Sequence, residues 1–391
     1  MNIFLSEPGI LCALGAGIAE VRENLFAGHA PGFEQTDRYS RERTLPLGCV
    51  TAPLPDLSDR PRAERSRNNA LVAACFAQIE PAFRAASAGV APERIAVVLG
   101  SSTSGIAEGE AAVAARMQSG EWPDEFEYAQ QELGAPAQFL ASLVGAKGPA
   151  YTISTACTSG AKALASAARL VRSGVVDIAI AGGADSLCRF TAAGFSALTA
   201  VSATRTNPFS ANRDGIHIGE GAALFVVSRS PAAVRLDGWG ESSDAHHISA
   251  PDPTGRGALA AVDSALARAG IAADALDYVN FHGTATRQND AMEAQVFAQR
   301  CPSVPGSSTK ALTGHALGAA GAIEAVICWL ALTDEERRLP PHIWDGMPDP
   351  ELPALSLVAP GQRATKPLRH ALSTSFAFGG NNAALVFSRH D

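Results

Sequence analysis

The sequence predicts an α/β fold that is built from two similar halves. Residues 88–99 align without gaps on residues 269–280, and each copy reads as a helix end, a short turn and a buried strand. Two further strands are expected at residues 175–183 and 221–227, where the chain is almost continuously apolar. Runs of this kind are typical of strands in a sheet that is covered by helices on both faces.

The repeat extends past these strands and predicts the domain organisation. Residues 154–155 and 308–309 are both Ser-Thr, and each pair precedes a helix-like stretch of small residues. The segment between the repeated strand and the Ser-Thr pair is longer in the first half than in the second, which predicts an inserted cap at about residues 105–148. Such an insertion would form a lid, a substrate-pocket wall or a subunit contact. We therefore expect an N-terminal half at residues 1–230 and a C-terminal half at residues 231–391.

Composition is that of a globular protein and argues against some functions. With 391 residues, 47% of them hydrophobic and 18% charged, the chain can bury a large core and is not disordered. A net charge of -8 argues against a general nucleic-acid binder, so an acidic partner would need a local basic patch. The only dense basic patch in the sequence is at residues 60–67, which include four arginines. These arginines either bind an acidic partner or are solvated residues at the start of a helix.

The cysteines indicate a reducing compartment and no metal site. The seven cysteines are scattered, odd in number and never spaced as CxxC, so neither a disulfide framework nor a zinc site is expected. The first residues lack a basic region followed by an apolar core, and no run approaches about 18 apolar residues. We therefore expect a cytoplasmic protein with no secretory signal, membrane span, metal or cofactor.

One cysteine occupies a position suited to nucleophilic catalysis. Cys157 lies in a tight turn, at residues 154–160, between an apolar strand and a helix whose small residues allow close backbone approach. The free N–H groups and the dipole of a helix N-terminus favour thiolate, which is the reactive form of cysteine. The alternative is a buried and inert cysteine, the commoner fate in an apolar chain.

Two histidines supply the partners that a nucleophilic cysteine needs. His282 ends the repeated strand in Asn-Phe-His-Gly-Thr, where the glycine lets the chain turn at once. Asp290 and Glu293 begin the helix that follows, either as helix caps or as support for an active site. His315 lies five residues after Lys310, next to a glycine and ahead of a second small-residue helix. One cysteine with two histidines predicts thioester chemistry.

A glycine turn near the C-terminus completes the set of candidate sites. Residues 373–382 follow one strand and precede another, and backbone N–H groups in such a turn can stabilise an oxyanion. A phosphate-binding loop is the alternative, but neither a helix nor a P-loop lysine follows the turn.

Together these motifs resemble the elongating type of β-ketoacyl-acyl carrier protein synthase. The shared motifs are Ala-Cys-Thr-Ser-Gly at residues 156–160, Asp-Gly-Ile-His-Ile-Gly-Glu-Gly at 214–221, His-Gly-Thr-Ala-Thr at 282–286, Lys310 with Thr-Gly-His at 313–315, and the turn at 376–382. They follow the family's order and span nearly the whole chain. The resemblance implies a thiolase-like fold, with two similar halves in a five-layer αβαβα sandwich, and a Cys-His-His triad.

The resemblance also implies how the acyl group is held. Cys157 would carry it, and the backbone N–H groups of Cys157 and Phe378 would bind the oxyanion of the tetrahedral intermediate. Phe378 would also gate the acyl pocket. The substrate-binding residues implied are Phe195, Asp244, Ser249, Phe376, Phe378, Thr284 and Thr286.

The histidines would serve the second step of the implied reaction. A malonyl group on the carrier loses carbon dioxide, and His282 and His315 would donate hydrogen bonds to the thioester oxygen of the resulting enolate. Lys310 and Glu293 would position these histidines. The enolate would then attack the acyl group on Cys157, which gives a β-ketoacyl product two carbons longer.

The implied partner is an acyl carrier protein with phosphopantetheine-linked acyl and malonyl groups. A homodimer, or a heterodimer with a related synthase, is expected as well. The residues around 240–247 and 286–290 look like those of synthases associated with bacterial aryl polyene pigments, so that pathway and fatty-acid elongation both stay open. The rival functions are a non-catalytic chain-length partner and an acyl-CoA thiolase.

The chain departs from the family pattern at three positions. Ala377 stands where a glycine is usual, Asn381 where a threonine is common, and His217 where an apolar residue is usual. We therefore expect a glycine turn that moves less freely and an altered acyl preference, with the reaction itself unchanged.

Overall fold

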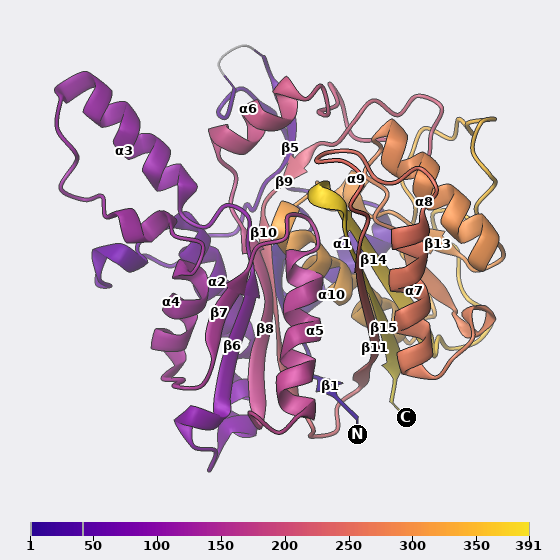
Figure 1. The fold of residues 1–391 in the computed structure, drawn as a ribbon, viewed down its shortest axis with the longest axis horizontal. Helices are drawn as coiled ribbons and strands as arrows, with labels where there is room; N and C mark the ends of the chain where they lie inside the picture. Colours follow the sequence, from indigo (N-terminus) through magenta and orange to yellow (C-terminus); the bar gives the residue numbers. More distant parts are fainter. Residues whose placement is uncertain (1, 41–42, 391) are drawn as a thin grey trace.

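Two sets of strands with the same order form the centre of the molecule, which the computed structural model describes at residues 2–40 and 43–390 (Figure 1). The first set is β7 (Ala150–Ile153), β6 (Ile95–Gly100), β8 (Ile178–Asp185), β10 (Gly221–Ser228) and β2 (Gly9–Cys12). The second set is β13 (Gly306–Ser307), β12 (Tyr278–Asn280), β14 (His370–Ala377), β15 (Asn381–Arg389) and β11 (Val234–Ser243). In each set the first three strands are parallel and the next two pairings are antiparallel. The predicted pair of similar halves is therefore confirmed, and the short β1 (Phe4–Leu5) joins them by pairing with β10 and β11.

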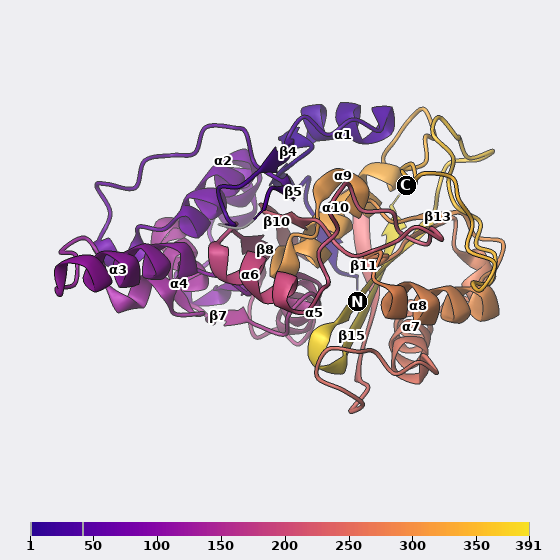
Figure 2. The same cartoon turned by 90° about the horizontal axis from the view of Figure 1, so that it is seen from above.

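Helices cover both strand sets and fill the space between them (Figure 2). The central layer is formed by α5 (Ser159–Arg172) and α10 (Ala320–Leu332), which contact strands of both sets. On the outside, α2 (Arg67–Ser87) and α4 (Ala135–Val144) cover the first set, and α7 (Arg256–Ala269) with α8 (Arg287–Arg300) lies beside the second. The order helix, sheet, helix, sheet, helix confirms the five-layer thiolase-like fold.

The remaining elements are short or lie at the edges of these layers. The helices are α1 (Ile18–Ala27), α3 (Ile106–Ser119), α6 (Arg189–Ala197) and α9 (Lys310–Thr313). The strands are β3 (Gly15–Ala16), β4 (Phe33–Thr36), β5 (Leu45–Gly48) and β9 (Ile218–Gly219). The 3-10 turns are Arg62–Glu64, Pro92–Arg94, Tyr128–Gln131, Ala273–Ala275, Leu317–Ala319 and Phe378–Gly380. Within the described ranges, no helix has the length and apolar character needed to cross a membrane.

The segment at residues 105–148 divides between two environments. Phe139 and Leu140 of α4 are buried in the core beneath β6 and β7. By contrast α3 projects from the body next to α6, and it exposes 48% of Val113 and 83% of Met117 (Figure 1). In the described part of the chain, no residue of this segment lines the cavity that holds Cys157. We propose that α3 is a subunit contact and that the halves divide between β10 and β11, at residues 230 and 231.

The arginines at residues 60–67 are held largely by the protein itself. Arg67 donates from Nε and Nη2 to the two carboxylate oxygens of buried Glu220, at 2.8 and 2.5 Å. Arg60 pairs with Glu64 at 2.6 Å, and its carbonyl oxygen accepts a hydrogen bond from Arg65 at 2.8 Å. Much of this charge therefore stabilises the start of α2.

Small residues let the two central helices cross closely. A Cβ on Gly160 of α5 would lie 2.9 Å from the backbone nitrogen of Ala322 in α10 and 3.0 Å from the carbonyl oxygen of Gly318. Both distances are shorter than normal packing contacts, so any side chain at this position forces the backbones apart. Because Gly160 has no side chain, the start of α5 can pack closely against the start of α10. Cys157 lies just before the first of these helices and His315 lies before the second.

Gly160→Ala is expected to lower the free energy of unfolding by about 1–3 kcal/mol, because overpacking outweighs the better helix propensity of alanine. Urea unfolding followed by circular dichroism measures the change. Gly194→Ala is the matched control, since a Cβ on this glycine of α6 meets nothing within 4 Å. That variant should gain about 0.5–1 kcal/mol. Equal shifts in the two variants would contradict the prediction.

Candidate active site

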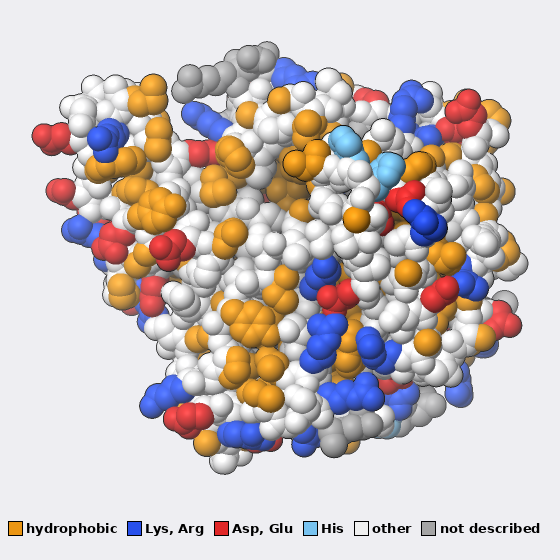
Figure 3. Space-filling model, viewed as in Figure 1, with side chains coloured by type: hydrophobic (Ala, Val, Ile, Leu, Met, Phe, Trp, Pro, Cys, Tyr) orange, Lys and Arg blue, Asp and Glu red, His pale blue; other side chains and the backbone are white. Residues whose placement is uncertain are grey.

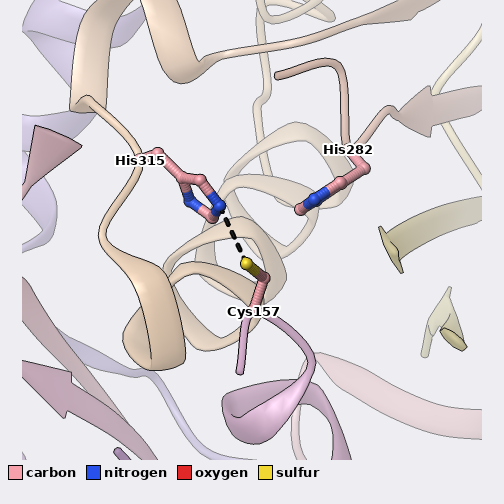
Figure 4. A group of neighbouring side chains, drawn as sticks. All are labelled: Cys157, His282 and His315. Carbon is pink, nitrogen blue, oxygen red and sulfur yellow. Dashed lines mark hydrogen bonds between the residues drawn. The ribbon is translucent and has the colours of Figure 1, made fainter. Parts of the chain in front are cut away.

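One cavity of about 620 Å³ brings together the three predicted catalytic side chains (Figure 4). The Sγ atom of Cys157 lies 3.0 Å from Nε2 of His315. A ring nitrogen of His282 completes a group of three atoms that all lie within 4.8 Å of one another. The two imidazoles meet edge to face, with ring centroids 5.4 Å apart. One thiol and two imidazoles thus face a single reacting centre, with the thiol from the first half and both histidines from the second.

A strained turn presents Cys157 just before α5. The strand β7 ends at Ile153, and Ala156 has a left-handed φ of 52°. The hydroxyl of Ser159 donates to the carbonyl oxygen of Ala156 at 2.6 Å and accepts the N–H of Thr155 at 2.9 Å. These bonds hold a conformation that costs a non-glycine residue about 1–3 kcal/mol. Strain of this kind is common where a side chain must be aimed at a reacting group.

Burial sets the protonation of the thiol and of its partner. Cys157 is 6% exposed, and desolvation raises the pKa of its thiol to about 12, although the charge of Lys310 opposes the shift. Burial first, and then Lys310, lowers the pKa of His315 well below its usual value. The resting pair is therefore neutral, with the thiol donating to Nε2. The sequence favoured a thiolate here, and the structure differs because the loss of hydration outweighs the helix dipole.

Alkylation of Cys157 by iodoacetamide is expected to accelerate about tenfold per pH unit from pH 7 to pH 10, because only the small thiolate fraction reacts this far below the thiol pKa of about 12. Intact-mass spectrometry of the adduct gives the rates, with Cys157→Ala as the blank. A plateau below about pH 9 would contradict the prediction and indicate a thiolate that is stabilised by His315.

Lys310 determines which nitrogen of His282 carries the proton. Its Nζ lies 3.3 Å from Nδ1 of His282 and donates to the backbone carbonyl oxygen of His282 at 2.5 Å. Since an ammonium group can only donate, Nδ1 accepts and the proton of the neutral ring lies on Nε2. Burial, followed by the charge of Lys310, lowers the pKa of His282 well below its usual value and keeps the ring neutral. His282 is therefore an N–H donor at Nε2.

Two carboxylates at the start of α8 hold the loop that carries His282. Glu293 accepts the backbone N–H of His282 at 2.7 Å. Asp290 accepts the N–H of Phe209 at 2.7 Å and that of Ala285 at 3.1 Å. Burial raises the pKa of Glu293 to about 7 and that of Asp290 to about 6. Both groups thus act on the backbone around the histidine, and neither contacts the imidazole through a hydrogen bond in the described part of the chain.

The cavity wall contains all seven residues expected to bind substrate, namely Phe195, Asp244, Ser249, Phe376, Phe378, Thr284 and Thr286. The rings of Phe195 and Phe378 lie 5.7 Å apart in this wall. The N–H of Gly379 donates to the carbonyl oxygen of Ile248 at 2.7 Å, and the N–H of Asp244 donates to that of Gly380 at 2.8 Å. The glycine turn is thus tied to the 244–249 loop at two points, and Phe378 lines the same cavity as Cys157.

The site also contains residues that sequence reasoning missed. Glu324 of α10 forms an ion pair with Lys310, and both side chains are buried, at 3% and 1% exposed. Glu324 is the lone acid in an otherwise apolar helix, which is a sequence signal that could have revealed a buried partner. Arg287, Gln288 and Asn382 also line the cavity. Nothing in the sequence distinguishes the first two from solvated residues at a helix start.

The triad also consists of residue types that bind zinc. Cys157, His282 and His315 each offer one ligand atom at this point. The ammonium of Lys310, however, lies 3.3 Å from Nδ1 of His282, and its positive charge opposes a cation in the same buried place. The geometry therefore suits an oxyanion or enolate better than a metal ion.

This chain is similar in sequence and in fold to known proteins. The family model for the β-ketoacyl synthase N-terminal domain matches residues 69–233, and that for the C-terminal domain matches residues 233–343. A ketosynthase from Xenorhabdus doucetiae, solved in complex with its chain length factor, is 43% identical, with a TM-score of 0.94 over 100% of this chain and 98% of that chain. A β-ketoacyl synthase from Burkholderia phymatum is 27% identical, with a TM-score of 0.89 over 100% of both chains.

Curated relatives match over a shorter region. The 3-oxoacyl-[acyl-carrier-protein] synthase 2 of Rhizobium meliloti is 36% identical over 264 residues, which span 62% of this chain and 62% of that protein. The two domain models follow the order of the two strand sets, with Cys157 in the first and His282 and His315 in the second. Because the domain models, the full-length structural match and the Cys-His-His cavity agree, the chain belongs to the β-ketoacyl synthase family.

Proposed function

We propose that this protein catalyses a decarboxylating Claisen condensation between an acyl group held on Cys157 and malonyl-acyl carrier protein. The product is a β-ketoacyl-acyl carrier protein two carbons longer. The observation that carries this proposal is the 3.0 Å contact between Sγ of Cys157 and Nε2 of His315, with His282 facing the same point. Covalent acyl transfer followed by enolate chemistry needs a thiol, an adjacent base and a second N–H donor.

In the first step, Sγ of Cys157 attacks the thioester carbonyl of the acyl carrier, and Nε2 of His315 takes the thiol proton. The carbon–sulfur bond to the carrier breaks, and His315 passes the proton to the leaving thiolate. The backbone N–H groups of Cys157 and Phe378 hold the oxyanion of the intermediate. The lowered pKa of His315 keeps its ring an unprotonated acceptor until the attack occurs.

In the second step, the malonyl group loses carbon dioxide and negative charge develops on its thioester oxygen. Once Sγ is acylated, no thiol donates to Nε2 of His315, so the neutral ring carries its proton on that nitrogen. The Nε2–H groups of His282 and His315 then donate to the thioester oxygen, where preorganised donors stabilise the transition state more than the ground state. The enolate carbon attacks the acyl carbonyl, the new carbon–carbon bond forms and the bond to Sγ of Cys157 breaks. The thiolate of Cys157 then takes a proton from solvent. Lys310 keeps the ring of His282 in the donating tautomer.

The two rival functions have less support. A non-catalytic chain-length partner needs no nucleophile, whereas Cys157 here has an imidazole 3.0 Å from its sulfur. An acyl-CoA thiolase uses a second cysteine near the C-terminus, and residues 373–391 contain none. The condensation is therefore the function that the site supports best.

The same proposal assigns the partners and the pathway. The carrier is an acyl carrier protein with phosphopantetheine-linked acyl and malonyl groups, and the chain pairs with itself or with a related synthase. A second chain is supported by the edge position of β7 and by the exposure of Met117 (83%) and Phe190 (66%) on α3 and α6. The reaction serves fatty acid, aryl polyene or polyketide-type biosynthesis in the cytoplasm.

Intact-mass spectrometry after mixing with acyl carrier proteins tests the proposal. Carriers with saturated and with polyunsaturated aryl groups are compared, and malonyl carrier is added second. The acyl mass is expected on the native protein and not on Cys157→Ala, and malonyl carrier should remove it with release of a β-ketoacyl carrier. Equal loading of Cys157→Ala, or no loading from any carrier, would overturn the mechanism. The preferred acyl group identifies the pathway.

Arg287→Ala is expected to raise KM for malonyl carrier about tenfold with little change in kcat, because a charge-assisted bond to the phosphate of phosphopantetheine is lost. Arg287 is exposed at the cavity mouth and is the first residue of α8, where the helix dipole disfavours a cation. No carboxylate forms an ion pair with it in the described ranges. Steady-state kinetics measure the effect, and Gln288→Ala is the uncharged control. An unchanged KM, or an equal effect in the control, would contradict this assignment.

A further inference from the structure

Arginines gather around the indole of Trp239, at the opposite end of α5 from Cys157. The guanidinium carbons of Arg169 and Arg172, in the last turn of α5, each lie 5.9 Å from a Trp239 ring centroid. That of Arg268, in the last turn of α7, lies 4.8 Å away. Figure 3 shows Lys and Arg side chains clustered below the centre of this face, where Figure 1 places α5 and its neighbours.

A cavity of about 250 Å³ lies beside this indole. It is bordered by Trp239 and by five polar side chains, those of Asn2, Arg172, Arg235, Asp237 and Arg268. None of these residues lines the cavity that holds Cys157. Three guanidinium groups from α5, α7 and β11 thus meet at one small opening.

Carboxylates neutralise only part of this positive charge. Asp237 pairs with Arg235 at 2.9 Å, and the nearby Arg169 is paired with a glutamate of β11. Neither Arg172 nor Arg268 forms an ion pair with a carboxylate among the residues that the structure describes. Desolvation first, and then the charges of its neighbouring arginines, lowers the pKa of Arg268. Two guanidinium groups therefore border the cavity without an ion pair to a described carboxylate.

Two residues that border the cavity also have buried N–H groups without acceptors among the described residues. Trp239 is 3% exposed, yet its Nε1 has no hydrogen-bond partner within the described residues. The same holds for the buried Nε of Arg235. A buried donor without an acceptor costs about 1–3 kcal/mol, so both groups favour an acceptor that comes from outside the chain.

We propose that this cavity binds a phosphate group. Guanidinium groups bind tetrahedral oxyanions through paired N–H donors. The cavity has three guanidinium groups, those of Arg172, Arg235 and Arg268. A volume of about 250 Å³ accommodates a phosphate with a small organic group attached. The site is separate from the condensation chemistry, and the proposal does not depend on it.

Helix dipoles alone do not explain the arrangement. Basic residues in the last turns of α5 and α7 complement the dipoles of those helices, which accounts for Arg172 and Arg268 singly. They do not account for Arg235 in the strand β11, for the meeting of both helix ends at one cavity, or for the buried N–H of Trp239. A bound oxyanion accounts for all of these observations together.

Isothermal titration calorimetry of the full chain with inorganic phosphate, at constant ionic strength in chloride, tests this site. One saturable site per chain is expected, weakened at least tenfold in Arg172→Gln and in Arg268→Gln. Two control variants should bind as the native protein does. Arg84→Gln removes an exposed arginine of α2 that pairs with Glu80. Arg287→Gln removes the arginine assigned above to the carrier's phosphate, so it distinguishes phosphate binding at the catalytic cavity from binding at this one.

Thermal melting without phosphate establishes that the variants are folded. Trp239→Phe keeps all the charges, removes one N–H donor and is expected to weaken binding about twofold to fivefold. No saturable binding beyond that of chloride, native affinity in Arg268→Gln, or loss of binding in Arg287→Gln would each overturn the proposal. Acidic side chains of a second subunit in the cavity would leave the assembled protein unable to bind phosphate, which also overturns it.

Discussion

Cys157→Ala is expected to lower the rate of condensation by about 10⁴-fold or more. The acyl-enzyme cannot form without Sγ, and the remaining groups supply only binding and oxyanion stabilisation. Replacing one small buried side chain by another leaves the contacts of α5 and α10 in place, so the fold is retained. Steady-state formation of the β-ketoacyl carrier measures the loss.

Malonyl decarboxylation provides the internal control for this variant. His282 and His315 still donate to the thioester oxygen in Cys157→Ala, so carbon dioxide release from malonyl carrier should stay within about tenfold of the native rate. Cys301→Ala changes another buried free cysteine outside the catalytic cavity and should leave both reactions intact. Condensation by Cys157→Ala near the native rate would contradict covalent catalysis.

The repeated strands and the three reactive side chains could be predicted because each leaves a local mark in the sequence. The apolar run at residues 175–183 becomes β8 (Ile178–Asp185), and its first three residues lie in the loop before the strand. Cys157, His282 and His315 each lie where a strand or turn meets the start of a helix. Such junctions combine glycines and other small residues with a single reactive side chain, and this pattern is visible within a few consecutive residues of the sequence.

Contacts between distant residues and the state of buried protons could not be predicted in this way. Glu324 lies 14 residues after Lys310, on another helix, and no local pattern says that the two meet. The pKa of the Cys157 thiol depends on how completely surrounding atoms exclude water, which the turn motif does not show. The motif favoured thiolate and the packed structure favours thiol. The cavity at Trp239 likewise joins two helix ends and a strand that are far apart in sequence.

Lys310→Met is expected to lower the free energy of unfolding by about 3–5 kcal/mol at pH 8, because it leaves the buried carboxylate of Glu324 without its cation. The loss should shrink toward pH 6. Burial already raises the pKa of Glu324 to about 6 beside Lys310, and removal of the ammonium raises it further. The folded variant therefore binds a proton at a higher pH than the unfolded chain does, and it gains stability as the pH falls. Urea unfolding at the two pH values measures the difference.

The double variant Lys310→Met with Glu324→Leu separates the structural role of the ion pair from its role in catalysis. Two apolar side chains in place of the buried pair should restore stability to within about 1 kcal/mol of the native protein. Condensation should nevertheless stay about 10²-fold below the native rate, because Nδ1 of His282 has lost the donor that places the proton on Nε2. Recovery of both stability and rate would show that Lys310 serves only as the counter-ion of Glu324. A stable protein that condenses slowly would show that the lysine acts through the tautomer of His282.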